Sequence, residues 1–200
     1  MARTFGEPAS MISETFWRGK SVIVTGGSSG IGRAIGEALG VAGARVGLIA
    51  RREEPLGSAT AAIRGRGGTA EAASCDVANA AALAAAVATL ERRLGVCEVA
   101  VASAGIHRTS WPLDAAIAAD VIDVNVKGCI HLAAATLPGM LVRRRGWFCG
   151  IASIAGVVGL PGNSVYCASK AAVAALLEGL RLDAGREGVW VTTALPGVID

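Results

Sequence analysis

Short apolar runs alternate with longer stretches of helical periodicity along most of the chain. The short runs are bounded by glycine, proline or polar residues, and this pattern predicts buried strands. The stretches between them place apolar residues three and four positions apart, which is typical of helices. The expected strands are Ser21–Thr25, Arg45–Ala50, Thr69–Cys75, Val99–Ser103, Phe148–Ser153 and Val189–Leu195. The expected helices are Arg33–Leu39, Ala78–Leu94, Leu113–Val142 with an interruption near Pro138-Gly139, and Tyr166–Arg186.

This alternation of strands and helices predicts an α/β fold of the doubly wound, Rossmann type. A parallel sheet would form the middle of three layers, with helices on both faces. The chain has 200 residues, which is enough for one domain with a full core. We expect that domain over residues 20–200, and residues 1–19 to be an extension that packs on the domain or on a partner.

Composition narrows the class of protein and its compartment. No apolar stretch reaches about 18 residues, so no transmembrane helix is expected, and a net charge of +3 is too small to imply nucleic acid. The five cysteines contain no C-x-x-C and fit free buried thiols in a reducing compartment. The two histidines have no metal-ligand spacing, and no signal peptide precedes the domain. We therefore expect a cytoplasmic protein without a metal.

A glycine-rich turn follows the first strand and leads directly into a helix. Its glycines let the backbone turn sharply and approach a pyrophosphate closely, and the helix N-terminus offers free N–H groups to it. The strand, turn and helix together predict a dinucleotide site. Its candidate residues are Gly26, Ser28, Ser29, Gly30, Ile31 and Gly32.

The end of the second strand distinguishes the two nicotinamide cofactors. An NAD site typically places an acid there for the ribose 2′-hydroxyl, whereas arginine suits a 2′-phosphate. Arg51 and Arg52 occupy this place, and the first acid is Glu53. NADP(H) is therefore favoured over NAD(H), although both arginines would also suit the start of an exposed helix. After the third strand, Asp76 would either accept from an adenine amino group or cap the next helix.

Ser153, Tyr166 and Lys170 are the candidate proton-transfer residues. Tyr166 and Lys170 are four positions apart in a predicted helix, so both side chains lie on one face. An ammonium beside a phenol favours the phenolate, and such a tyrosine can exchange a proton with a substrate oxygen. Ser153 ends the fifth strand and can hydrogen-bond the same oxygen. The alternative is a half-buried tyrosine beside a solvated lysine.

The combination of these motifs resembles the short-chain dehydrogenase/reductase family over about residues 20–200. Ser153 lies 13 residues before Tyr166, which is the spacing usual in that family. The matching segments are T-G-G-S-S-G-I-G (Thr25–Gly32), Asp76-Val77, A-S-A-G (Ala102–Gly105), V-N-V-K-G around Asn125, I-A-S-I-A-G around Ser153, Y-C-A-S-K (Tyr166–Lys170) and Pro196-Gly197.

The resemblance implies a role for each catalytic candidate. Tyr166 would be the general acid/base, and Ser153 would polarise the substrate oxygen. Lys170 would stabilise the phenolate and hold the nicotinamide ribose, while Asn125 would help hold a water that relays protons to Lys170. Hydride would pass between nicotinamide C4 and a carbonyl or carbinol carbon, in the reducing direction with NADP(H). Further cofactor contacts are implied at Asp76, Val77, Ala104, Gly105, Tyr166, Lys170, Pro196, Gly197 and Ile199.

The chain departs from the family pattern in two respects. Ala102 and Ser103 replace two asparagines that are frequent after the fourth strand, which removes a brace but no proton-transfer residue. Family members also usually continue past the Pro-Gly turn into a substrate lid and a seventh strand, whereas this chain ends at Asp200. We therefore expect either a fragment or a protein without the lid, with an exposed sheet edge and without surface often used in homo-oligomers. A full-length protein is expected to be a homo-oligomer.

Two functions remain open on the sequence. The first is an NADP(H)-dependent oxidoreductase acting on a small carbonyl or alcohol substrate, and the second is a nucleotide-binding module without turnover. His107, Trp111 and Val157–Pro161 are expected to border the substrate pocket. The apolar loop Val157–Pro161 suggests a substrate with an apolar portion, such as an acyl chain, a sterol or a sphingoid ketone. The sequence resembles both 3-oxoacyl reductases and 3-ketosphinganine reductases, and this does not decide between the possible substrates.

Overall fold

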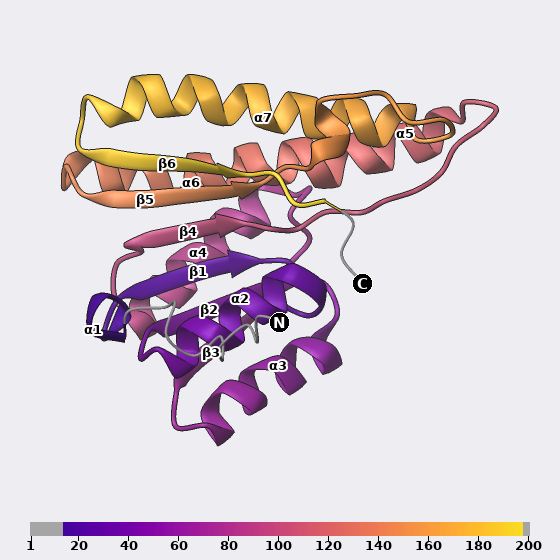
Figure 1. Cartoon of the computed structure of the whole chain (residues 1–200). Coiled ribbons are helices and arrows are strands. Elements are labelled where there is room, and N and C mark those ends of the chain that lie inside the picture. The colour runs from indigo at the N-terminus through magenta and orange to yellow at the C-terminus, as the bar shows by residue number, and fades with distance from the viewer. Residues whose placement is uncertain (1–13, 198–200) are drawn as a thin grey trace, which may run out of the picture.

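The computed structural model describes residues 14–197, and they form a six-stranded parallel sheet with helices on both faces (Figure 1). The order of strands is β3-β2-β1-β4-β5-β6. The strands are β1 (Ser21–Thr25), β2 (Arg45–Ala50), β3 (Thr69–Ser74), β4 (Val99–Ala102), β5 (Gly146–Ile151) and β6 (Val189–Ala194). The helices are α1 (Glu14–Trp17), α2 (Gly30–Val41), α3 (Glu53–Gly65), α4 (Ala80–Leu94), α5 (Ala115–Ile122), the π-helical turn η2 (Asp123–Lys127), α6 (Gly128–Val142), the 3₁₀ turn η3 (Ile154–Gly156) and α7 (Ser164–Gly185).

The predicted doubly wound α/β sheet is confirmed, and its strand order reverses beside β1. Every adjacent pair of strands is parallel, and β1 pairs with β2 on one side and with β4 on the other. All the carboxyl ends therefore point to one edge of the sheet. In open α/β sheets, the place outside these ends where the strand order reverses is where ligands bind.

Two apolar cores lie on the two faces of the sheet, which is why the central strands have consecutive apolar residues. Ile23 of β1 belongs to the core shared with α4, α6 and α7. Its neighbours Val22 and Val24 point to the opposite face, into the core shared with α2 and α3. Successive side chains of a strand alternate between faces, so each strand anchors both helical layers.

The predicted break in the long helical stretch near Pro138-Gly139 is wrong. Pro138 lies inside α6, one turn before its end, and the helix continues to Val142. A proline inside a helix removes one N–H···O=C bond and crowds the carbonyl four residues earlier, yet α6 continues past Pro138. The irregular turn is η2 instead, which joins α5 to α6 and contains Asn125. Such π-helical turns are rare and are frequent at functional sites.

Several sequence expectations concern features outside the sheet. Trp17 of α1 stacks on Trp147 of β5, with 6.0 Å between the ring centres, while residues 1–13 lie outside the described part of the chain. The five cysteines are free, and four of them are buried, with Cys149 partly exposed. Within residues 14–197, no helix combines the length and the apolar character that a membrane span requires.

Candidate active site

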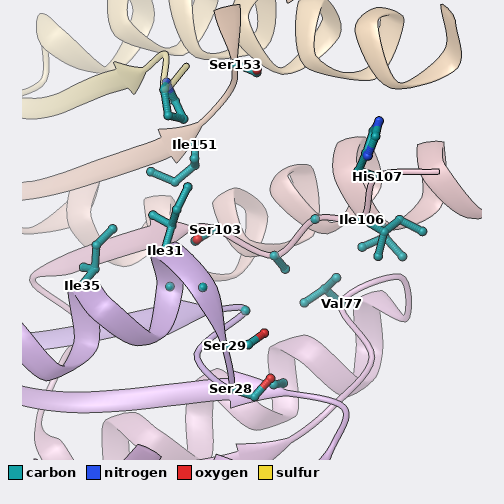
Figure 2. Close-up of a pocket in the computed structure, with 18 of the residues that line it drawn as sticks. Ser28, Ser29, Ile31, Ile35, Val77, Ser103, Ile106, His107, Ile151 and Ser153 are labelled. Atoms are coloured by element: carbon teal, nitrogen blue, oxygen red, sulfur yellow. The ribbon is translucent and has the colours of Figure 1, made fainter. Parts of the chain in front are cut away.

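A cleft of about 1180 Å³ opens at the carboxyl ends of the strands, between the turn after β1 and the N-terminal part of α7. In Figure 2, Ser28 and Ser29 lie in the lower part of the view, and His107 and Ser153 lie in the upper part. The cleft is at the place where the strand order reverses, so the fold itself positions it. Of the predicted cofactor residues, the cleft is lined by Gly26, Ser28, Ser29, Gly30, Ile31, Gly32, Arg51, Arg52, Val77, Ala104, Gly105, Tyr166, Lys170, Pro196 and Gly197.

The glycine-rich turn needs glycine at Gly26 and Gly32 because other chain segments approach them closely. Gly26 has φ of 71°, and a Cβ there would lie 2.9 Å from the Ala104 backbone. A Cβ on Gly32 would lie 2.5 Å from the Gly26 carbonyl oxygen. Ser29 precedes α2 and makes no side-chain capping hydrogen bond. The first N–H groups of α2 thus remain available at the cleft, which suits a pyrophosphate.

Thr25 connects the ends of β1 and β4 beneath this turn. Its hydroxyl oxygen accepts from the Ser103 and Ala104 N–H groups at 3.2 and 3.3 Å, and its hydroxyl donates to the Val101 carbonyl at 3.4 Å. These bonds hold in place the segment in which Ala102 and Ser103 lack amide side chains. The sequence contains Thr25 within the glycine motif, but nothing in its spacing predicts this partner.

Arg51 and Arg52 both line the cleft just beyond β2, and both are exposed. The Arg51 guanidinium lies 3.7 Å from an Asp76 carboxylate oxygen, while Arg52 is the residue before α3. Asp76 does not line the cleft itself. The suggested capping of α4 by Asp76 is wrong, because Asn79 caps that helix by accepting from the Ala82 N–H at 3.0 Å.

Ser153, Tyr166 and Lys170 lie on the opposite wall of the same cleft. Ser153 follows β5, and its Oγ accepts from the Ala155 N–H at 3.1 Å. Tyr166 and Lys170 are in α7, with the Lys170 Nζ 5.8 Å from the centre of the phenol ring. This Nζ donates to the Ile151 carbonyl at 2.9 Å. Lysine 170 is almost fully buried, and desolvation lowers the pKa of its ammonium group below the ordinary value of 10.5.

Asn125 does not line the cleft but supports the wall behind it. Its Oδ1 accepts from the Ile106 N–H at 2.7 Å, and its Nδ2 donates to the Ile106 carbonyl and to Ser169 Oγ, both at 3.0 Å. The π-helical turn thereby joins the loop after β4 to α7. A Cβ on Gly105 would lie 3.3 Å from Asn125 Oδ1 and 3.5 Å from Lys170 Nζ, so these two polar atoms border the same small space.

Other parts of the sequence prediction fall outside the cleft. Trp111 does not line it and is 83% exposed, and residues 157–161 do not line it either. Ile199 lies outside the described residues. His107 does line the cleft, as expected for a residue after β4. Residues that the sequence did not predict as site residues also line it, namely Ala34, Ile35, Ala50, Cys75, Ser103, Ile106, Val124, Ile151 and Ala152.

Most of these additional residues are apolar and contribute wall rather than chemistry. Ile31 and Ile35 are four positions apart on α2, so the helical period was a signal that both face one way. Ile151 and Ala152 stand directly before Ser153 in the I-A-S-I-A-G segment, but no periodicity marked their side chains as part of a wall. They follow from the position of β5 in the sheet, which only the strand order reveals.

Comparison with known proteins gives a consistent result. The sequence profile of the family described as short chain dehydrogenase matches residues 20–200. An uncharacterised oxidoreductase of Myxococcus xanthus is 35% identical over 186 residues, which cover 90% of this chain and 72% of that protein. The curated relatives differ in length, and the chain spans between 14% and 79% of them.

Two solved structures illustrate the range of cofactors among similar folds. A structure of an actinorhodin polyketide ketoreductase variant with NADPH has a TM-score of 0.88 and 33% identity, covering 90% of this chain and 71% of that one. A structure of NAD⁺-bound xylitol dehydrogenase has a TM-score of 0.87 and 30% identity, with the same two shares covered.

Proposed function

The chain belongs to the short-chain dehydrogenase family, and on that basis we propose that it transfers hydride between NADP(H) and a ketone or secondary alcohol. Tyr166 acts as the general acid/base, and the reaction runs in the direction of carbonyl reduction. The substrate is a small molecule with an apolar portion, because isoleucine and alanine side chains make up much of the cleft wall around the polar groups.

One observation carries this proposal. The glycine-rich turn and the Ser153, Tyr166 and Lys170 side chains come from opposite ends of the sequence and line one continuous cleft. A site that only bound a nucleotide would need the first feature and not the second. A tyrosine beside a solvated lysine is the weaker interpretation, because Lys170 is only 6% exposed.

The residues present fit a dinucleotide. The close approaches at Gly26 and Gly32 leave no room for side chains, and the uncapped start of α2 offers N–H groups to a pyrophosphate. Pro196 and Gly197, beyond β6, line the cleft at its other end. When bound there, the nicotinamide ring supplies or accepts the hydride.

The protein contributes the proton and its pathway. Ser153 Oγ accepts a hydrogen bond from the Ala155 N–H, so its own hydroxyl hydrogen can donate to a substrate oxygen. The Tyr166 hydroxyl donates its proton to the same oxygen as hydride reaches the carbon. Lys170 lies beside the phenol ring with an ammonium pKa that burial lowers, which eases transfer of a proton from Lys170 to the phenolate.

Asn125 has a positioning role in this pathway. Its side chain holds the backbone of Ile106 and, through Ser169, the turn of α7 that carries Tyr166. The space beside Gly105, bordered by Asn125 Oδ1 and Lys170 Nζ, has polar partners for a water molecule. Such a water would return the proton that Lys170 loses.

Cofactor preference depends on Arg51 and Arg52. Both residues line the cleft beyond β2, the strand end at which an NADP site would use arginine for the 2′-phosphate, and no carboxylate among the cleft-lining residues takes the place of an NAD-selecting acid. The side chains of Arg51 and Asp76 are both exposed to solvent, and the guanidinium and carboxylate are 3.7 Å apart. Such an exposed ion pair is weak, so a 2′-phosphate can compete for the guanidinium.

The reaction is tested by following NADPH oxidation with a panel of ketones. Wild type should turn over, and Tyr166→Phe should lose about 10²–10⁴-fold in kcat, with NADPH affinity measured by fluorescence as the control for an intact site. If wild type and Tyr166→Phe bind NADPH equally and neither oxidises it with any ketone, the protein is a nucleotide-binding module instead.

The cofactor preference is tested separately. Arg51→Gln should weaken NADPH binding by roughly 10-fold to 100-fold, because a charge-assisted hydrogen bond contributes about 1.5–3 kcal/mol, and should leave NADH binding nearly unchanged. Arg66→Gln is the matched control, since Arg66 is at the other end of α3 and pairs with Glu37. An equal loss for both cofactors would exclude a contact with the 2′-phosphate.

A further inference from the structure

Two loops are joined beside the cleft-lining residues His107 and Tyr166. The loop after β4 donates the Ser110 N–H to the Gly162 carbonyl at 3.0 Å. A second connection is the hydrogen bond between His107 Nε2 and Asn163 Oδ1. Asn163 is the residue before α7, the helix that carries Tyr166. His107 is therefore held from the side and cannot turn freely, although it is exposed to solvent.

The hydrogen bonds of Asn163 determine which ring nitrogen of His107 carries the proton. The Asn163 Nδ2 donates to the Pro161 carbonyl at 2.9 Å, and a carbonyl can only accept. This orients the amide so that Oδ1 faces His107, and an amide oxygen also can only accept. The Nε2 atom must then be the donor, and Nδ1 of the neutral ring is left with a lone pair.

Nδ1 has no hydrogen-bond partner within residues 14–197, and its ring lies against the catalytic tyrosine. The His107 and Tyr166 rings meet edge to face, with 4.8 Å between their centres and 75° between their planes. Both rings line the cleft, and Figure 2 shows His107 beside Ile106 on the loop after β4. A fixed acceptor is thus carried by a ring in contact with the tyrosine ring whose hydroxyl would protonate the substrate.

We propose that His107 is a substrate-recognition residue, whose Nδ1 accepts a hydrogen bond from a hydroxyl or N–H group next to the reacting carbonyl. This proposal rests on the function proposed above. Because the two rings are in contact, we expect the donor to lie close to the reacting carbonyl, on its α or β carbon. The preferred substrate class is therefore a ketone with a hydroxyl or N–H group on one of these carbons, and a simple alkanone leaves Nδ1 without a partner.

The test compares ketones that differ only by one hydroxyl group. Acetoin against butanone probes the α position, and diacetone alcohol against methyl isobutyl ketone probes the β position. The measured quantity is the ratio of kcat/KM for the hydroxylated ketone to kcat/KM for its partner. His107→Phe keeps a ring against Tyr166 but has no acceptor, so the ratio for at least one pair should fall about three- to tenfold.

A matched control separates recognition from a general disturbance of the loop. Arg108 is the next residue, pairs with Asp120 at 3.0 Å and does not line the cleft. Arg108→Gln should leave both ratios at their wild-type values. If His107→Phe lowers kcat/KM equally for both members of each pair, His107 is only a packing residue and the proposal is refuted.

Two measurements remain decisive even if no ketone is reduced. The first is titration calorimetry of both ketone pairs, acetoin with butanone and diacetone alcohol with methyl isobutyl ketone, binding to the protein in the presence of NADP⁺. In at least one pair, wild type should bind the hydroxylated ketone more tightly, and His107→Phe should remove this difference. If wild type binds both members of each pair equally, recognition by His107 is refuted. Nitrogen NMR of the imidazole should report the Nε2–H tautomer in wild type and a mixture in Asn163→Leu. An Nδ1–H tautomer in wild type would refute the assignment, whereas absence of NADPH oxidation alone would refute only the proposed reaction.

Discussion

Replacement of Asn125 by alanine removes the main polar connection between the π-helical turn and the rest of the site. The Asn125 side chain is 2% exposed and makes three hydrogen bonds, two to the Ile106 backbone and one to Ser169 Oγ. Alanine keeps the helical backbone but offers none of these partners. The Ile106 N–H and carbonyl then depend on water from the adjoining cleft.

The size of the effect follows from these three bonds. Each intramolecular hydrogen bond contributes about 1 kcal/mol net, and a buried group left without a partner costs about 1–3 kcal/mol. Because Ile106 is only partly buried, water can recover some of this loss. Asn125→Ala should therefore lower the free energy of unfolding by about 2–3 kcal/mol, which corresponds to a Tm roughly 4–12 °C lower for a domain of this size.

Urea unfolding followed by tryptophan fluorescence measures this difference, and Ser169→Ala is the second arm of a double-mutant cycle. Ser169 shares one bond with Asn125 and donates another to the Tyr166 carbonyl at 2.7 Å. The double variant should be more stable than additivity predicts, by about 1 kcal/mol, because the shared bond is lost only once. A loss below about 0.5 kcal/mol for Asn125→Ala, or strictly additive losses, would refute this account.

Two further predictions concern backbone packing and buried thiols. Gly32→Ala should destabilise the protein by about 1–3 kcal/mol and weaken NADPH binding, because its Cβ would lie 2.5 Å from the Gly26 carbonyl oxygen. Gly57→Ala should instead stabilise by about 0.5–1 kcal/mol, because only the neighbouring backbone of α3 surrounds the added Cβ within 4 Å. Equal effects of the two substitutions on thermal unfolding would contradict the packing argument. Burial raises the pKa of Cys97 and Cys129 from 9.0 to about 12, so the unfolded chain ionises first. Their stabilising contribution is complete below pH 9.0 and falls toward pH 12, by up to about 1.4 kcal/mol per pH unit for each thiol. Urea unfolding with reductant should show this decline, and Cys129→Ala should reduce it.

Local features of the sequence were sufficient for the fold class. Val22–Val24 and the corresponding runs are apolar at consecutive positions, which buried parallel strands require, and the helices between them carry their own period. The glycine-rich turn was also predictable, since Gly26 and Gly32 are needed by the backbone path itself. The strand limits agreed with the structure to within two residues.

Local features were insufficient where two outcomes had similar local energies. A break at Pro138 and a π-helical turn around Asn125 both fit a long helical stretch, and the structure contains only the second. Asp76 and Asn79 are both suitable caps, and α4 begins after Asn79. In each case the choice depends on packing against other elements, which is not encoded in neighbouring positions.

By itself, therefore, the sequence determined the strands, the glycine-rich turn, the candidates Ser153, Tyr166 and Lys170, and the helices apart from α3 and the limits of α5 and α6. Only the tertiary structure decided that the turn and these candidates share one cleft, that Lys170 is buried against the Ile151 carbonyl, and that His107 is held by Asn163. These contacts join residues that are 19 and 56 positions apart. Periodicity reports which face a residue takes on its own element, whereas burial and hydrogen-bond partners depend on how the elements are placed beside one another.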